Sequence, residues 1–575
     1  MRLLDCFAPL FSYGLALLDE QAAAAASRGE VAPIQARAQA LVELARKNAL
    51  AEGKSLTDVE MAGFAVVAWF DEIIMRDELR WEQGNPLQLT LFHTGDAASE
   101  FFDHLARLDG DAEEVREVYC TALLLGFVGQ YYYENGDSGE LGRIKAVYCR
   151  PYAASAATLQ ALHKDSITPQ PYLAPDSPAR RLPGPWAGSR SALFVALGVV
   201  LLVLVAFVAP VFSSAMPAQT WYLAGILLVI AGMLGWAGSL AWHSLVTSRA
   251  LTQVTTDARG GYDIRNVWTA IRNAARRVRG SLLHPFRRRG KWRQLARHPW
   301  LLFLGDGEAN VPGLLQSAAH ASHGRLLPSD GALTSGHWWL FRSLVAIEMN
   351  ARLVQVQADT RTEDQLWSEA LTKFSRERRK LPLDGVVLCV GAQSLLQPSR
   401  AVASIVARLR GMADEATQRL GLQLPLYVLV TGLESLPGQA SFRAALPVPV
   451  FRKVLGSRMS EAAAPNGAAG EMRGQADVVI ERMHMVGLAA LANQHEPHAR
   501  RGIFEFNQSL SGLRQGLHVF LDALMVEDPA AQRRLRWCGL YFTSKPQGDT
   551  PNGDFVDDLF NRFLPGDRLL ARRIE

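Results

Sequence analysis

The chain has 575 residues and a formal net charge of +4 at pH 7. This length allows three or four domain-sized units, and the small net charge argues against a chain whose whole surface binds nucleic acid. Hydrophobic residues make up 49% of the chain, and a mean hydropathy of +0.03 fits soluble domains with a small membrane fraction. The five cysteines have no CxxC spacing, which favours reduced thiols over a disulfide framework.

Residues 1–150 are predicted to form an all-α helical bundle. Apolar residues recur at helical spacing, glycine and proline cluster at the turns, and no strand-like alternation is present. Helices are expected over 34–52, 56–76, 101–108 and 115–130. Asp71 and Glu72 do not suggest an acid–base pair, because adjacent helical residues point about 100° apart. Structure-locking or solvated carboxylates beside a core Trp69 are the better interpretation.

Several segments of this bundle resemble the DotU/TssL family. They are FAVVAWFDEIIMR at 64–76, Trp81, LQLTLF at 87–92, EFFDHL at 100–105 and LLLGFVGQYYYENGDSGEL at 123–141. The resemblance implies a cytoplasmic helical domain of a type VI secretion inner-membrane complex, or of the related type IVB systems. Candidate partner-contact residues are Trp69, Asp71, Glu72 and Trp81. Val128 and Gln130 stand where the family usually has a glutamate and an arginine.

A proline-rich linker, 151–190, leads to two charge-free apolar runs at 192–212 and 221–240, separated by eight residues. The first run would be about 30 Å long as a helix, enough to cross the hydrocarbon core. We therefore predict a transmembrane hairpin at 192–240 that also serves as the insertion signal, since the start of the chain does not resemble a cleavable signal peptide. Positively charged flanks predict that both soluble parts are cytoplasmic. These flanking residues are Arg180, Arg181, Arg190, Arg249 and Arg259.

The juxtamembrane segment 245–297 is basic, with eleven Lys or Arg residues and no acidic residue between positions 265 and 297. Anionic lipid is the favoured partner because the segment follows the hairpin directly. A nucleic-acid patch using Trp268 and Trp292, or a surface for an acidic partner, are the alternatives. The candidate lipid-contact residues are Arg276, Arg277, Arg279, Arg287, Arg288, Arg289, Lys291 and Arg293.

Residues 298–450 alternate short apolar runs with helical segments, which predicts a parallel α/β sheet. Strands are expected at 300–304, 344–349, 386–390 and 426–431, and helices at 362–380 and 398–420. The first strand runs into a loop at the place of a G-x-x-x-x-G-K-[ST] phosphate loop. There Gly305 keeps the first glycine, Asn310 replaces the second, Val311 the lysine and Pro312 the hydroxyl residue. The chemistry needs that lysine charge and that hydroxyl, so we expect no hydrolysis.

The same region is similar to the N-terminal cytoplasmic part of the TssM/IcmF family, which carries a two-span hairpin before a GTPase-like domain. The similarity lies in HPWLLFLGDGEANVPGLL at 298–315, HWWLFRSLVAIEMNARL at 337–353, LPLDGVVLCVGAQSLL at 381–396, LPLYVLVTGLESLPG at 424–438 and LRWCGLYFTSKPQG at 535–548. The resemblance implies a P-loop-GTPase-like fold. It also places Glu348 and Ala351 at switch positions and Thr431 and Glu434 at guanine-element positions, without the family's glycine and lysine. No cofactor is expected.

Residues 451–575 are predicted to be mainly helical. Helices are expected at 476–494 and 503–527, a short strand at 535–542 and a basic-ended helix at the end of the chain. His495 and His498 are spaced as a possible metal pair, but Pro497 and the lack of a third ligand favour a polar turn, so no metal site is expected. By the resemblance, the chain stops before the further span and periplasmic region of TssM proteins.

These observations predict a multidomain bacterial inner-membrane protein that fuses a TssL-like domain to a truncated TssM-like module. It would be a non-enzymatic scaffold without catalytic residues that holds baseplate or membrane-complex subunits of a type VI secretion system. Expected partners are those proteins and anionic lipid, with a possible homo-oligomer and no nucleic acid. The alternatives are a nucleotide-binding switch that uses backbone amides, and a competitor or regulator of TssL–TssM assembly.

Overall fold

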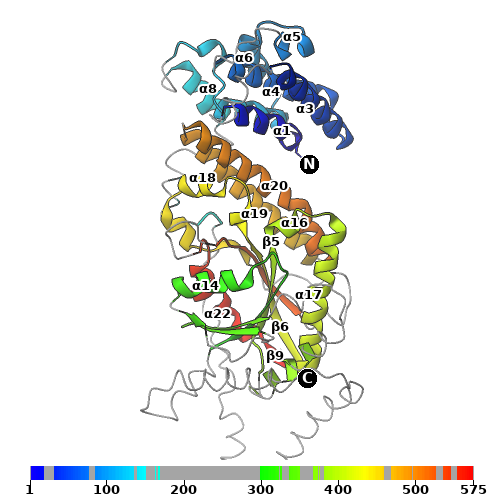
Figure 1. Ribbon diagram of the computed structural model, residues 1–575, viewed down its shortest axis with the longest axis vertical. Coiled ribbons are helices and arrows are strands. Elements are labelled where there is room, and N and C mark those ends of the chain that lie inside the picture. Colours follow the sequence, from blue (N-terminus) through cyan, green and yellow to red (C-terminus); the bar gives the residue numbers. More distant parts are fainter. Residues whose placement is uncertain are drawn as a thin grey trace, which may run out of the picture.

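The structure, a computed structural model, describes two bodies of the chain (Figure 1). The described residues are 2–18, 31–76, 85–134, 139–149, short pieces between 159 and 168, 298–322, 324–326, 336–349, parts of 367–378, 381–458, 468–494, 496–525, 535–545 and 553–573. The predicted hairpin at 192–240 and the basic segment at 245–297 lie outside them. Among the described helices, none combines the length and apolar character needed to span a bilayer.

The N-terminal body is all helical, as predicted. Its helices are α1 (Leu3–Leu17), α3 (Val31–Ala51), α4 (Leu56–Arg76), α5 (Leu87–Phe92), α6 (Ala97–Arg107), α7 (Glu113–Leu124) and α8 (Glu140–Tyr148), with a 3-10 turn at Gly129–Tyr131. Helix α7 ends earlier than expected because Gly126, at φ +104°, leaves the helical region of backbone space. The bounds of α4 agree with the expectation.

Helix α1 was not predicted as an element, yet it lies on the side of this body that faces the second body (Figure 1). It contacts α3, α4 and α7, and it also contacts α20 of the second body. Gly14 permits the closest approach, because a Cβ there would lie 2.7 Å from the ring of Trp69. Phe11 packs edge-on against Trp69, with ring centroids 4.8 Å apart. Such an aromatic pair contributes about 1 kcal/mol beyond its area burial.

The second body is built on a nine-stranded sheet in the order β2-β3-β4-β1-β5-β6-β8-β7, with β9 pairing β6 outside this path. The five central strands are parallel, as the predicted parallel α/β sheet requires, but β2, β3, β7 and β9 pair antiparallel, so the sheet as a whole is mixed. The strands are β1 (Trp300–Gly305), β2 (Arg325–Leu326), β3 (Gly336–Leu340), β4 (Val345–Met349), β5 (Gly385–Gly391), β6 (Leu422–Thr431), β7 (Leu455–Arg458), β8 (Leu535–Phe542) and β9 (Arg572–Arg573).

Strands β7 and β8 come from the part of the chain beyond residue 450, so the sheet combines both predicted C-terminal units. The end of the chain is not one basic-ended helix. It forms a π-helical turn at Leu559–Phe563, a short α22 (Leu564–Gly566), a 3-10 turn at Asp567–Leu570 and then β9. The strand replaces the expected helix because its backbone pairs with the start of β6.

Each face of the sheet has its own apolar cluster. One cluster joins Phe303 on β1 to Leu315 on α14 and to Phe560. The other joins Leu302, on the opposite face of β1, to α17, α19, α20 and the helical domain. The helices of this body are α14 (Val311–Ala321), α16 (Ala392–Leu395), α17 (Ser399–Leu420), α18 (Gln439–Ala444), α19 (Ala468–Asn493) and α20 (Pro497–Leu524), with 3-10 turns at Leu433–Ser435 and Val448–Arg452.

Helices α19 and α20 form an antiparallel hairpin that lies between the helical domain and the sheet (Figure 1). A short piece of the predicted linker contacts the sheet body as well. Ile167 is buried, and the Thr168 hydroxyl accepts a hydrogen bond from Gly456 N–H on β7 at 3.1 Å. The described residues 166–168 of the linker are therefore anchored at the edge of the sheet.

Candidate functional site

The loop after β1 keeps the strand–loop–helix geometry of a phosphate loop, but its side chains close it. Asn310 adopts a left-handed conformation at φ 43°, and its Oδ1 accepts a hydrogen bond from Gly313 N–H at 3.2 Å. Val311, at the expected lysine position, is buried and packs so close to Gly305 that a Cβ there would collide with it. Pro312 follows in the first turn of α14 and has neither hydroxyl nor N–H.

Asp306 places a buried carboxylate in this loop. Its Oδ1 accepts hydrogen bonds from Ala309 N–H and Gly391 N–H, both at 3.1 Å, and its Oδ2 accepts one from the Ser394 hydroxyl. Burial raises the pKa of Asp306, although those three donors act in the opposite direction. The Ala309 amide is therefore already bonded to a carboxylate, and negative charge lies where a phosphate loop offers positive charge.

The other positions of the predicted nucleotide site make structural contacts. Glu348 is buried and accepts a hydrogen bond from Trp339 Nε1–H at 2.8 Å, and its bond with His337 raises the pKa of that histidine. The Thr431 hydroxyl donates to the Ala309 carbonyl at 2.7 Å, and Glu434 accepts from Lys545 N–H at 2.8 Å. Ala351 lies outside the described residues. The described part of this site supplies neither an ammonium group nor a hydroxyl at the positions that nucleotide chemistry needs.

Two of the predicted partner-contact residues, Trp69 and Asp71, lie in the core of the helical domain. Trp69 is fully buried. Asp71 is also buried, and it accepts hydrogen bonds from Leu87 N–H at 3.2 Å and Gln88 N–H at 2.8 Å, which caps α5. Burial raises the pKa of Asp71 to about 6 despite these bonds. Neither residue offers surface to a partner in this conformation.

Glu72 links α4 to the turn after α7. Its carboxylate accepts hydrogen bonds from Val128 N–H at 3.0 Å and from Gly129 N–H at 2.7 Å. The interpretation of Asp71 and Glu72 as structure-locking carboxylates therefore agrees with their geometry. Trp81 lies outside the described residues, as do all the candidate lipid-contact arginines and the lysine of the basic segment.

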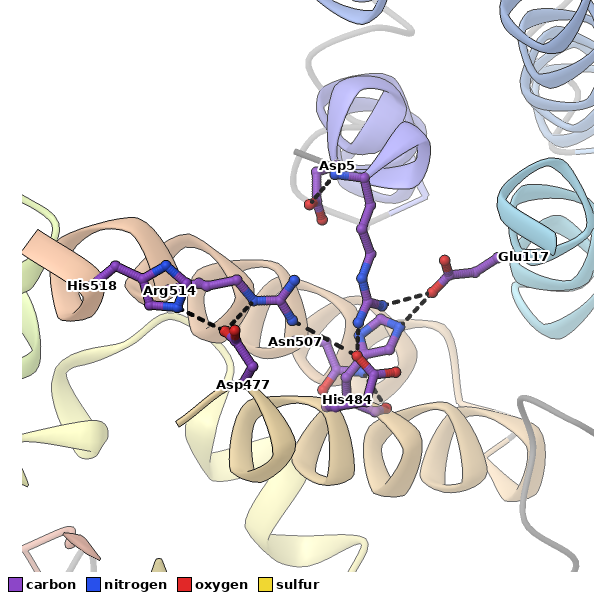
Figure 2. A network of polar contacts seen from close by, with 9 residues as sticks. Asp5, Glu117, Asp477, His484, Asn507, Arg514 and His518 are labelled. Atoms are coloured by element: carbon purple, nitrogen blue, oxygen red, sulfur yellow. Dashed lines mark hydrogen bonds and ion pairs between the residues drawn. The ribbon is translucent and has the colours of Figure 1, made fainter. Parts of the chain in front are cut away.

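The structure brings together a different site, the surface at which α1 and α7 dock on α19 and α20 (Figure 2). Its apolar part pairs Phe11 with Phe504, with ring centroids 5.7 Å apart. Elsewhere on this surface the Arg500 guanidinium lies against Gly126. A Cβ added to this glycine would be only 2.9 Å from Arg500 Nη1, so no larger residue fits there without a shift. A cation near the C-terminal end of α7 interacts favourably with the helix dipole.

Buried charges occupy the centre of this docking surface. Glu117 on α7 is 6% exposed, and its Oε1 lies 2.9 Å from His484 Nε2 on α19 and 3.1 Å from Arg2 Nη1. Burial alone would raise the pKa of Glu117, but the hydrogen bond and charge of His484, together with Arg2, hold it below its ordinary value. A buried charge of this kind is tolerated only when it is paired.

The polar contacts continue along the hairpin toward solvent (Figure 2). Arg2 also pairs with Glu481, which lies 3.7 Å from Arg514 Nη2. Asp477 is 3.4 Å from Arg514 Nε and 2.9 Å from His518 Nε2. Acidic and basic side chains therefore alternate from the start of α1 to the second half of α20. We refer to Arg2, Glu117, Asp477, Glu481, His484, Arg514 and His518 as the docking network.

Sequence reasoning missed this network because its members are far apart in the chain; Glu117 and His484 are separated by 367 positions. The available signal was an acidic residue within the apolar face of a helix, between Val115 and Val118. His498 is the second residue of α20, directly after Pro497, and His495 lies outside the described residues. Within the described parts of the chain, no group of three or more His, Cys, Asp or Glu side chains is arranged to hold a metal ion.

Comparison with known proteins shows that two parts of the chain are similar to different families. Residues 2–213 match the family described as type VI secretion system protein DotU, and residues 360–573 match the IcmF-related N-terminal domain. The first match includes the apolar run at 192–212, and the second includes the α19–α20 hairpin but begins after the loop at 305–312. The docking network therefore joins Arg2 and Glu117 of the DotU-matched region to residues of the region that matches the IcmF-related domain.

A curated relative agrees with this assignment. The type VI secretion system component TssM1 of Pseudomonas aeruginosa is 24% identical over 291 residues, which are 49% of this chain and 26% of TssM1. The aligned part thus spans only about a quarter of that relative's length. No solved structure matches the chain. Residues 2–213 are thus similar to type VI secretion system protein DotU and residues 360–573 to the IcmF-related N-terminal domain, so that one polypeptide joins segments similar to both families.

Proposed function

We propose that this protein is a non-enzymatic scaffold of a type VI secretion inner-membrane complex, holding baseplate or other membrane-complex subunits at the cytoplasmic face. The two family matches support membership of such a complex. The observation that favours a scaffold is the docking network, in which Arg2 and Glu117 of the DotU-type domain bind Glu481 and His484 of the IcmF-related domain. The docking network thereby holds the two domains, and any partner that each domain binds, in one fixed arrangement.

Joining two modules in one chain raises their effective concentration without any new contact. The apolar runs at 192–212 and 221–240 would anchor the protein in the inner membrane as a two-span hairpin, with both soluble parts in the cytoplasm. An inner-membrane location is also in line with the DotU and TssM1 similarity. The scaffold would thus present both cytoplasmic domains from one membrane position.

Affinity purification of the full-length protein from native membranes, after mild crosslinking, tests this function. We expect baseplate or type VI membrane-complex subunits in the eluate, and fewer of them with Arg2→Glu, which places like charges beside Glu117 and Glu481. Arg143→Glu is the matched control, since Arg143 is exposed on α8 and pairs only locally with Glu140. Recovery of unrelated proteins alone, from cells with an assembled apparatus, would contradict the proposal.

Deletion of the gene separates a component from a competitor of TssL–TssM assembly. Secretion should fall if the protein is a component, and it should rise if the protein occupies TssL or TssM sites without supporting assembly. A nucleotide-binding switch predicts Mg²⁺-dependent heat on titration with GTP or ATP. We expect none at millimolar nucleotide, because Asp306 and Val311 occupy the loop.

A further inference from the structure

Asp306 bonds the altered loop to β5 and to α16, and α16 packs against α20 of the α19–α20 hairpin. Its carboxylate joins three elements: the loop through Ala309, the end of β5 through Gly391, and α16 through Ser394. The carboxylate is 5% exposed, and Ser394 is buried as well. A hydrogen bond to a buried carboxylate is strong, and loss of its donor leaves a buried acceptor unsatisfied.

Helix α16 in turn lies directly against α20. A Cβ on Gly516 of α20 would overlap the carbonyl oxygen of Leu395, so the two backbones are in contact there. Twelve residues earlier on α20, about 18 Å along a helix, Phe504 contacts Phe11 of the helical domain. Asp306, α16, α20 and α1 therefore form one continuous series of packed contacts.

We propose that Asp306 is a positioning residue for the docking surface: its carboxylate, a fixed internal anion, sets α16 and thereby holds α20 in the position that receives the helical domain. The inference rests on the proposed function, because it assumes that the docked arrangement is the working one. In a nucleotide-binding protein the phosphate loop binds an exchangeable phosphate. In this chain the carboxylate of Asp306, which is part of the polypeptide, bonds to the loop instead. Docking would then be permanent rather than dependent on nucleotide.

The same two strands carry a second buried aspartate, which supplies the control. Asp384 immediately precedes β5 and accepts a hydrogen bond from Trp300 N–H, at the start of β1, at 2.7 Å; it also pairs with Arg378. It thus joins β1 to β5 at the end opposite to Asp306. Ser317 is the control for Ser394, because it is buried on α14, over the other face of the sheet, and its hydroxyl donates to Gly313.

The test measures docking in the full-length protein by the distance between two spin labels. Leu50→Cys on α3 and Val448→Cys in the turn after α18 are exposed positions, one in each body, and the five native cysteines are buried. The unaltered protein should give one narrow distance distribution. We expect Ser394→Ala and Asp306→Ala to lose most of the narrow component, while Ser317→Ala and Asp384→Ala retain it.

Added formate provides a readout that a merely structural role would not give. It can take the place of the missing carboxylate, so it should restore the narrow distribution in Asp306→Ala and leave Asp384→Ala unaffected. The inference is overturned if Ser394→Ala keeps the narrow distribution, or if Asp306→Ala and Asp384→Ala broaden it equally and without rescue. Should Asp306→Ala fail to fold, Ser394→Ala against Ser317→Ala decides the question.

Arg2→Glu, which breaks the docking network itself, distinguishes the two proposals. If Arg2→Glu broadens the distribution and Ser394→Ala does not, docking stands and only the role of Asp306 fails. If Arg2→Glu leaves the distribution narrow, the docking network does not hold the domains, and the proposed function fails with it.

Discussion

At the scale of single residues, two buried carboxylates of the helical domain respond to pH in opposite directions. Asp71 caps α5 from within the core, and its pKa is raised from 3.8 to about 6 by burial. Glu117 belongs to the docking network, and its pKa is lowered by His484 and Arg2. The two residues therefore make separable contributions to stability as pH changes.

For Asp71 the folded state favours the protonated carboxyl. Its contribution to stability is complete below pH 3.8 and is lost as pH rises through about 6, a change of about 3 kcal/mol. Asp71→Asn, which cannot ionise, should remove this decline, so its melting temperature should fall less between pH 4 and pH 6.5 than that of the unaltered protein. Asp103→Asn, at an exposed position of α6, should behave like the unaltered protein.

For Glu117 the folded state favours the ionised carboxylate, so its contribution is present above pH 4.5 and is lost as pH falls through its lowered pKa. Glu117→Ala leaves Arg2 and His484 without this partner, which costs about 3–5 kcal/mol for a buried pair. We expect faster hydrogen exchange in α1 and in 500–510 of α20. Unchanged exchange would show that Glu117 does not hold the domains; Glu43→Ala, at an exposed position of α3, is the control.

At the scale of helices and strands, packing of α20 depends on glycine. A Cβ on Gly516 would overlap the Leu395 carbonyl oxygen, a backbone atom that cannot move aside cheaply. Gly516→Ala should therefore lower the melting temperature by an amount equivalent to about 1–3 kcal/mol. Gly411→Ala on α17, where nothing lies within 4 Å, should be neutral or stabilising by about 0.5–1 kcal/mol. A Gly516→Ala melting temperature equal to that of Gly411→Ala would contradict the close contact.

The helices and strands that could be predicted from sequence are those whose secondary structure follows from their own spacing of apolar residues. The β1, β5 and β6 strands are buried on both faces, so each is a continuous apolar run, and α4 has helical apolar spacing. Edge strands such as β7, four residues long, have no such signal. Helix α1 was missed because it contains Pro9 and Gly14, residue types that usually mark turns.

The features of the candidate site likewise fall into those visible in a short stretch of sequence and those that depend on tertiary contacts. Loss of the phosphate-loop lysine and hydroxyl at Val311 and Pro312 is visible in one short segment. The bonds of Asp306 are not, because Gly391 and Ser394 become its neighbours only after β1 and β5 pair. Pairing of Glu117 with His484 depends on the docking of two bodies, which no local pattern encodes.

At the scale of the whole molecule, the basic segment at 245–297 is predicted to bind anionic lipid, at about 1 kcal/mol per basic residue near the surface. Replacing Arg287, Arg288 and Arg289 with glutamate should reduce the anionic lipid that co-purifies with the full-length protein. The charge-matched control replaces three exposed arginines of the described domains, Arg107, Arg143 and Arg562. Equal lipid loss in both variants would mean that net charge, rather than this segment, attracts the lipid.

The single apolar cluster that includes both Phe11 and the sheet residue Leu302 also has a consequence for synthesis. Glu117 leaves the ribosome 367 residues before His484, a delay of about 20–70 s at ordinary rates of translation. During that time the side of α1 and α7 that later meets the α19–α20 hairpin lacks its cover. A nascent chain must therefore keep this surface from aggregating, or from accepting the α20 of a finished neighbour, until its own hairpin arrives.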